Sequence, residues 1–253
     1  MILGLEFPPL SHIVNWPEFI GGDTLGINKV VLIYFFAAIM TMLVFILGNQ
    51  KKMVPTGAQN LAEMSVEFVD EQIALPAMGT RGLKWTPYFI SLFFFIFFCN
   101  IFEIIPVIQM PATARIALPA FLALLTYVLY HGAGFKEHGP LGYLKHTLVP
   151  PGTPAALLPL MVLIEFISAF IVRPFSHAVR LFANLLAGHI LLVTFAILSS
   201  ALWIAQWNVI FLPLPVFAVV FFTLFELLVS FLQAYVFTLL AAVYIGLAVS
   251  HEH

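Results

Sequence analysis

The sequence is short of charge. Only 9% of its 253 residues are Asp, Glu, Lys or Arg, against about a quarter in an ordinary soluble domain, and 62% are hydrophobic. This composition excludes a soluble globular domain, and the net charge of −2 excludes a broadly basic nucleic-acid binder. The chain is therefore expected to be an integral membrane protein that contacts the lipid bilayer and no nucleic acid.

Several chemistry-bearing patterns are also missing. Cys99 is the single cysteine, so no internal disulfide is possible. The eight histidines show no His-Glu-x-x-His or Cys-His spacing, which argues against a metal site. There is no Gly-x-x-x-x-Gly-Lys-Ser/Thr loop, so the chain does not itself hydrolyse a nucleotide. Residues 1–9 lack the basic start and apolar core of a cleavable signal peptide. We expect no cofactor and no metal.

Long apolar runs are what the sequence has instead. They predict five membrane crossings, at residues 30–47, 87–105, 116–130, 154–203 and 212–249. A polar loop with Lys136 and Lys145 is expected after the third. Each of the last two runs exceeds the roughly 20 residues of one perpendicular crossing, so each either hides two spans or is one strongly tilted helix. No polar turn divides either run, which favours a tilted helical hairpin over residues 154–250.

Residues 57–75 have a different pattern. Their acidic residues fall at helical spacing, opposite the apolar ones: Glu63, Glu67, Asp70 and Glu71. This predicts an amphipathic interfacial helix, with a solvated hairpin arm as the alternative. Residues 1–28 are polar and are expected outside the membrane. The predicted fold is thus one all-α membrane domain over residues 1–253, with five transmembrane helices and one interfacial helix.

Basic residues predict the orientation. Lys51, Lys52, Arg81 and Lys84 flank the segment after the first span, while Arg115 alone follows the second. The positive-inside rule then places the N-terminus outside and the C-terminus in the cytoplasm.

Arg180 lies inside the fourth apolar run. A guanidinium keeps its charge in a protein, and placing it at membrane depth costs at least about 2.5–3.5 kcal/mol. With about 100° per helical residue, small and polar side chains share its face: Ser176, Ala183, Asn184 and Ala187. Such a stripe lets another helix approach closely. His189 points to the opposite face.

The last run carries a second polar stripe. Glu226 and Gln233 are seven residues apart and share a face, with Ser230 and Tyr244 close to it. A carboxylate at membrane depth is usually paired, protonated or on an ion path, whereas Gln233 and Ser230 are equally explained by interhelical hydrogen bonds.

Other charged residues in apolar runs extend this pattern. Glu165 lies in the fourth run and Glu103 near the end of the second. For Glu103 an interfacial position is the alternative, because Pro106 ends its helix nearby. Arg173 is more simply an interfacial residue whose side chain reaches towards water.

Three motifs together resemble one family. Residues 180–189 (RLFANLLAGH) closely resemble the signature helix of subunit a of rotary proton-driven ATP synthases. Residues 100–106, which include Asn100 and Glu103, are similar to its Asn-x-x-Asp/Glu-x-x-Pro element, and residues 232–240 to its last-helix Gln-Ala motif. Glu165, Arg173-Pro174 and Glu226 also find counterparts, although the stretch from Glu165 to Pro174 is one residue longer than in many members. The resemblance covers roughly residues 30–250.

The resemblance implies a non-catalytic stator subunit in a bacterial plasma membrane. Its partners would be a ring of c subunits, the peripheral-stalk b subunits and the rest of the synthase. Two aqueous half-channels would end near Arg180, which would stabilise a deprotonated ring carboxylate and block a direct leak. The implied proton-pathway residues are Asn184, His189, Glu226, Gln233, Glu165, Glu103, Asn100, Ser176 and Tyr244. We expect His189 and Glu226 to line the outer half-channel together, with Asn184 and Gln233 nearer the ring.

Two alternatives stand beside this interpretation. An ion-coupled secondary transporter would also use intramembrane Arg and Glu residues, but the sequence shows no inverted-repeat halves. A purely structural membrane anchor leaves Arg180, Glu226 and Gln233 unexplained.

Overall fold

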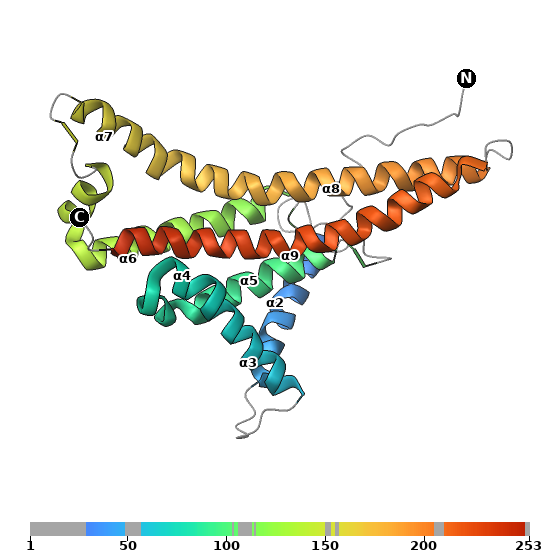
Figure 1. Ribbon diagram of the computed structural model, residues 1–253, viewed down its shortest axis with the longest axis horizontal. Coiled ribbons are helices and arrows are strands. Elements are labelled where there is room, and N and C mark those ends of the chain that lie inside the picture. Colours follow the sequence, from blue (N-terminus) through green and yellow to red (C-terminus); the bar gives the residue numbers. More distant parts are fainter. Residues whose placement is uncertain are drawn as a thin grey trace, which may run out of the picture.

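The computed structural model is built from helices (Figure 1) and describes residues 29–48, 57–102, 104–105, 113, 115–149, 153–154, 157–204 and 210–250. Four helical runs are long and apolar enough to cross a membrane: Ala58–Ile101, Ala117–Leu148, Leu158–Trp203 and Pro213–Val249. Val30–Ile46 is a shorter apolar helix. The predicted all-α integral membrane fold is confirmed. Glu103, residues 1–28 and the C-terminal residues 251–253 lie outside the described part.

The helices follow one another with few long connections. In chain order they are α2 (Lys29–Gly48), α3 (Ala58–Val69), the π-helical turn η1 (Asp70–Ala74), α4 (Leu75–Met78), the 3-10 segment η2 (Gly79–Trp85), α5 (Thr86–Ile101), α6 (Ala117–Leu148), α7 (Leu158–Ile167), the π-helical turn η4 (Ser168–Val172), α8 (Arg173–Ile204) and α9 (Pro213–Val249). Proline stands at the first positions of α5, α7 and α9, where its missing N–H costs no helical hydrogen bond.

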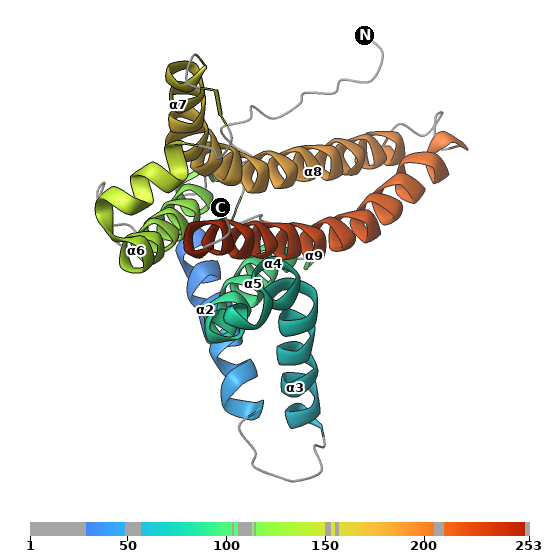
Figure 2. The same cartoon turned by 60° about the vertical axis from the view of Figure 1, so that its left-hand side comes forward.

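The last two helices form the predicted hairpin, and Figures 1 and 2 show α8 and α9 side by side. The run Leu158–Trp203 has 46 residues and α9 has 37. At 1.5 Å per residue these are about 69 Å and 55 Å long, well beyond a bilayer core of about 30 Å. Because both runs are apolar and helical throughout, with only a π-helical turn in the first, each is one long helical stretch rather than two spans. Helix α9 packs against α8, α5 and α6, and so forms the centre of the fold.

A π-helical turn interrupts the run between α7 and α8. Residues Ser168–Val172 form η4, and the hydroxyl of Tyr130 on α6 donates to the carbonyl of Ala169 at 3.0 Å. A π-helical turn holds about one residue more than an α-helical turn. The 100° spacing of an uninterrupted α-helix therefore does not relate Glu165 to the residues of α8 that follow.

The predicted polar loop around Lys136 and Lys145 was wrong, because α6 continues to Leu148. The chain bends inside α6 at Gly139, whose φ of 71° suits a residue without a side chain. Beyond the bend, the Tyr143 ring packs against Gly134 and its hydroxyl lies 2.9 Å from His131 Nδ1. The charged residues were read as a loop, yet they occupy the exposed side of this bent helix.

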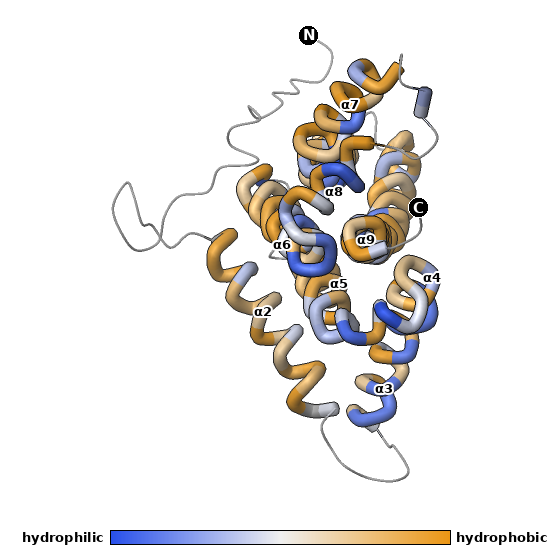
Figure 3. The backbone as a smooth tube through the Cα atoms, turned by 90° about the vertical axis from the view of Figure 1, so that its left-hand side faces the viewer, coloured by the Kyte–Doolittle hydropathy of each residue, from blue (hydrophilic) through white to orange (hydrophobic). Residues whose placement is uncertain are grey.

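Helix α3 is amphipathic, as predicted. Along α3 and η1 the acids Glu63, Glu67 and Glu71 are exposed and Val69 and Ile73 are fully buried, whereas Leu61 and Met64 are exposed. Figure 3 shows hydrophilic residues on α3 and between α4 and α5, in contrast to the mostly hydrophobic α2 and α9. Whether α3 lies at the membrane interface stays a prediction, because the structure contains no bilayer.

The segment from α3 to η2 docks on the C-terminal half of α9. The Tyr235 hydroxyl donates to the Gln72 carbonyl at 3.3 Å, and Arg81 Nη1 donates to the Val249 carbonyl at 3.4 Å. A cation at a helix C-terminus also complements the helix dipole. Gly246 lies against α4, where an ideal Cβ would be 2.8 Å from the Ala77 carbonyl oxygen. These contacts hold α9 in a fixed axial position.

Candidate functional site

Two contacts fix the register of the α8–α9 hairpin. The Glu226 carboxylate on α9 lies directly against Gly188 on α8. Eleven residues away on each helix, the His177 ring lies 3.7 Å from the Phe237 ring, centroid to centroid. Both pairs match the same antiparallel alignment. Residue 180 is therefore level with residue 234, and residue 184 is level with residue 230.

Arg180 lies between two groups of polar residues along this hairpin. It is half-buried, and it forms no hydrogen bond or ion pair within the described residues. Its neighbours on the predicted stripe are open to the outside of the chain: Ala183, Asn184 and Ala187 are exposed and Ser176 is half-buried. Small side chains beside an arginine give a face that a further helix can approach closely.

The first group lies towards the loop end of the hairpin, where α8 is followed by α9. Glu226 is 3% exposed and His189 is 7% exposed, and both interact with other groups of the chain. The Glu226 carboxylate occupies the space that a side chain at position 188 would fill. Ser230 and Gln233 follow on the same buried face of α9. We refer to Gly188, His189 and Glu226 as the loop-end cluster.

The second group lies at the open end of the hairpin, where α8 begins and α9 ends. Arg173 Nη2 lies 3.9 Å from Glu165 Oε2, and the Arg173 guanidinium lies 5.9 Å from the centre of the Tyr244 ring. All three residues line a cavity of about 190 Å³ that also touches Tyr130 and Tyr143. We refer to Glu165, Arg173 and Tyr244 as the open-end cluster.

Helical rise places Arg180 near the middle of these clusters. Eight residues separate it from Gly188 and seven from Arg173, which correspond to about 12 Å and 10 Å along α8. The hairpin therefore carries a fixed positive charge with one polar cluster on each side of it.

Asn100 belongs at the level of the loop-end cluster. Phe93 and Phe97 on α5 contact Phe231 on α9, and Arg81 contacts the end of α9, so the two helices run antiparallel. Continuing this register brings residue 100 close to the level of residue 226. Asn100 is fully buried and accepts a hydrogen bond from Thr113 Oγ1 at 2.8 Å. Glu103, three residues further on, lies outside the described residues.

Sequence reasoning missed two members of this site. Gly188 was read only as part of a motif, although its lack of a side chain is what admits the Glu226 carboxylate. His177 received no role, yet it is buried between α8 and α9. Glu226 and Phe237 are eleven residues apart on one face of α9, as Gly188 and His177 are on α8. Once the hairpin register is known, this equal spacing pairs Glu226 with Gly188 and Phe237 with His177.

Comparison with known proteins identifies the family. The ATP synthase A chain family matches residues 30–246. ATP synthase subunit a of Frankia alni is 42% identical over 97% of this chain and 87% of its own length. The subunit a of Rhodococcus erythropolis is 40% identical over 90% of this chain and 84% of its own, and that of Streptomyces lividans 39% over 99% and 90%.

The chain belongs to the ATP synthase subunit a family. It is a non-catalytic, multi-pass membrane subunit of the proton-translocating sector of a bacterial ATP synthase. Family membership decides against both alternatives, a secondary transporter and a purely structural anchor. It does not by itself assign roles to single residues.

Proposed function

We propose that two aqueous half-channels end at the α8–α9 hairpin, one on each side of Arg180. Protons pass from one half-channel to the other only on the carboxylates of a rotating c ring. One observation carries this proposal: Arg180 is half-exposed on a small-residue face, with a polar cluster on each side along the same helix pair. A ring helix on that face would bring its carboxylate to the guanidinium.

Electrostatics gives Arg180 two tasks. It stabilises a ring carboxylate that has lost its proton, because an ionised carboxylate is costly to leave in a medium of low dielectric constant. It also repels a proton that would pass straight from one cluster to the other. Each charge that crosses a potential of 100 mV yields about 2.3 kcal/mol, and this energy drives rotation only if no such shortcut exists.

The loop-end cluster is the outer, proton-entry half-channel in this proposal. Asn100 would stand near its mouth, His189 and Glu226 along it, and Asn184 and Gln233 nearest the ring. Glu103 keeps the proton-pathway role that the resemblance implies. An imidazole beside a carboxylate suits proton transfer, because histidine titrates near neutral pH. A buried structural ion pair between α8 and α9 is the alternative for His189 and Glu226.

The open-end cluster is the inner, proton-exit half-channel. Glu165, Ser176 and Tyr244 would line the way from Arg180 to the cavity of about 190 Å³. This assignment places the N-terminus outside and the C-terminus in the cytoplasm of a bacterial plasma membrane, in agreement with the bias of basic residues.

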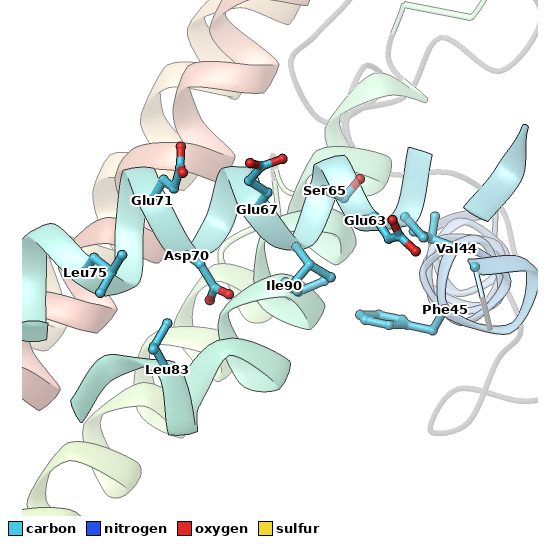
Figure 4. A pocket seen from close by; sticks show the side chains of 13 residues that line it. Val44, Phe45, Glu63, Ser65, Glu67, Asp70, Glu71, Leu75, Leu83 and Ile90 are labelled. Atoms are coloured by element: carbon cyan, nitrogen blue, oxygen red, sulfur yellow. The ribbon is translucent and has the colours of Figure 1, made fainter. Parts of the chain in front are cut away.

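We propose a binding site for the peripheral stalk in a groove formed by the first helices of the chain, away from the α8–α9 hairpin. The groove has a volume of about 780 Å³ and lies between α2, the segment from α3 to η2, and α5. Figure 4 shows the side chains that line it. Its lining combines apolar side chains, such as Val44, Leu75 and Ile90, with carboxylates. Asp70 is directed towards the segment that carries Leu83, whereas Glu67 and Glu71 point away from it.

Such a surface fits an apolar helix with basic residues at the membrane boundary, and we assign it to a b subunit. Glu63→Lys, at the carboxylate that lies towards Val44 and Phe45 in the groove, should release the b subunits from the purified complex while the c ring remains. Unchanged copurification of b would contradict this partner.

The experiment that tests the main proposal measures two properties of one complex. The purified subunit should carry the c ring with it. In inverted vesicles, Arg180→Ala should abolish ATP-driven proton pumping yet allow passive proton flow through the membrane sector. Arg180→Lys should also fail, because a desolvated lysine can lose its proton and lacks the planar guanidinium. Normal proton-driven synthesis with Arg180→Ala would overturn the mechanism.

A further inference from the structure

His177 is a buried polar side chain whose ring nitrogens form no hydrogen bonds with the described residues. It is 3% exposed, and neither Nδ1 nor Nε2 has a hydrogen-bond partner within the described residues. The ring packs on Phe237 at 3.7 Å between centroids with an interplanar angle of 31°, and meets the edge of Tyr244 at 5.8 Å. A neutral imidazole always offers one donor and one acceptor.

Packing alone does not explain a histidine at this position. A phenylalanine would make the same ring contacts and would bury no polar atom, whereas an unsatisfied buried polar group is unfavourable. Buried polar groups without protein partners are commonly satisfied by ordered water. Water between α8 and α9 would satisfy the two nitrogens of His177.

His177 lies between Arg180 and the cavity at the open end of the hairpin. On α8 it is three residues from Arg180 and four from Arg173, so it lies about one turn from each, on a neighbouring part of the helix surface. Tyr244, which contacts its ring, also lines the open-end cavity. His177 thus stands between that cavity and Arg180, on the side that faces α9.

We propose that His177 anchors the water chain that links Arg180 to the open-end cavity, as a positioning residue of the inner half-channel. Its neutral ring accepts a hydrogen bond from one water and donates one to the next, so protons pass along the waters while the imidazole itself keeps its protonation state. The charged and titratable groups that interact with it are Arg180 on α8 and Tyr244 on α9. The inference rests on the proposed function, since a water chain here matters only if the hairpin conducts protons.

Two substitutions separate this role from packing, because the two roles rank them in opposite order. His177→Gln keeps a donor and an acceptor but loses the aromatic ring. His177→Phe keeps the ring and loses both polar atoms. The measurement is passive proton flux through the membrane sector in inverted vesicles stripped of the catalytic sector, normalised to the amount of assembled complex. Tyr88→Phe likewise keeps a ring and removes a polar atom, here one that bonds Thr126 between α5 and α6, outside both clusters. It is the control and should conduct as the wild type does.

We expect His177→Phe to lower the flux at least tenfold and His177→Gln to stay within about threefold of the wild type. Wild-type flux with His177→Phe overturns the inference, and so does a loss with His177→Gln as large as that with His177→Phe. Should His177→Phe not assemble, His177→Met serves as the apolar variant under the same criterion. Arg180→Ala is measured alongside: if it fails to pump while His177→Phe conducts normally, only this inference falls, whereas normal pumping with Arg180→Ala removes the proposed function itself.

Discussion

The carboxylate of Glu226 on α9 lies directly against the Cα atom of Gly188 on α8. An ideal Cβ at position 188 would stand 2.6 Å from Glu226 Oε1, far closer than a normal van der Waals contact. The glycine thus creates the space in which a membrane-embedded acid is held. The same contact places His189, the next residue on α8, at the level of this acid.

Gly188→Ala should displace the Glu226 carboxylate. Inserting a methyl group into such a tight contact typically costs about 1–3 kcal/mol. We expect ATP-driven pumping in inverted vesicles to fall at least about fivefold, which corresponds to about 1 kcal/mol in a barrier. Gly132→Ala is the control, because a Cβ at that helical position in α6 meets nothing within 4 Å. Equal pumping by the two variants would show that the position of Glu226 is not critical.

Exchanging His189 and Glu226 tests whether the pair relays protons. His189→Glu together with Glu226→His keeps one acid and one imidazole at the loop end of the hairpin. We expect each single variant to lose most proton pumping and the double variant to recover part of it. A structural ion pair would instead change the thermal stability of the complex without this recovery in flux. Full pumping by both single variants would remove the two residues from the pathway.

Arg173 should tolerate substitution far better than Arg180. It already has a partner in Glu165 at 3.9 Å, and both side chains are more than a quarter exposed. Ion pairs of this kind contribute about 0–1 kcal/mol. Arg173→Gln should therefore keep more than half of the pumping activity, measured beside Arg180→Gln, which should have none. Comparable losses of pumping in both variants would show that Arg173 is as important for proton movement as Arg180.

Gly246→Ala should loosen the docking of α4 on α9 without touching the polar clusters. A Cβ at this position would stand 2.8 Å from the backbone oxygen of Ala77, which cannot move as a side chain can. The expected cost is about 1–3 kcal/mol, seen as a lower melting temperature of the purified complex. The proton flux per assembled complex should stay normal. An unchanged melting temperature would mean that α4 shifts freely.

The topology is tested by cysteine labelling in intact cells. With the buried Cys99 replaced by serine, single cysteines at residues 52 and 253 should both be protected from an impermeant reagent and both react in inverted vesicles. The physical reason is the basic bias on that side of the first span. Labelling of one but not the other in intact cells would overturn the five-crossing arrangement.

The sequence by itself determined the class of the protein. The scarcity of charge and the length of the apolar runs predicted a helical membrane protein. Inside a bilayer the backbone N–H and C=O groups must bond one another, and a long apolar run can do so as a helix. The absence of a polar turn in the last two runs predicted the long hairpin, and the residues around Arg180 predicted the family. These features follow from composition and from periodicity along one helix, both of which are local.

Only the tertiary structure decided which residues meet. The contact of Glu226 with Gly188, and of His177 with Phe237, depends on the axial register of α8 against α9, and a shift of one turn would replace both pairs. Helix α6 supports that register, because it packs against both α8 and α9 and its Tyr130 hydroxyl donates to the Ala169 carbonyl just before α8. The bend in α6 escaped prediction for a similar reason: its polar residues resemble a loop until Tyr143 is seen to pack on Gly134 and bond His131. Sequence periodicity fixes the face of a helix, whereas its position along a neighbour is fixed by packing.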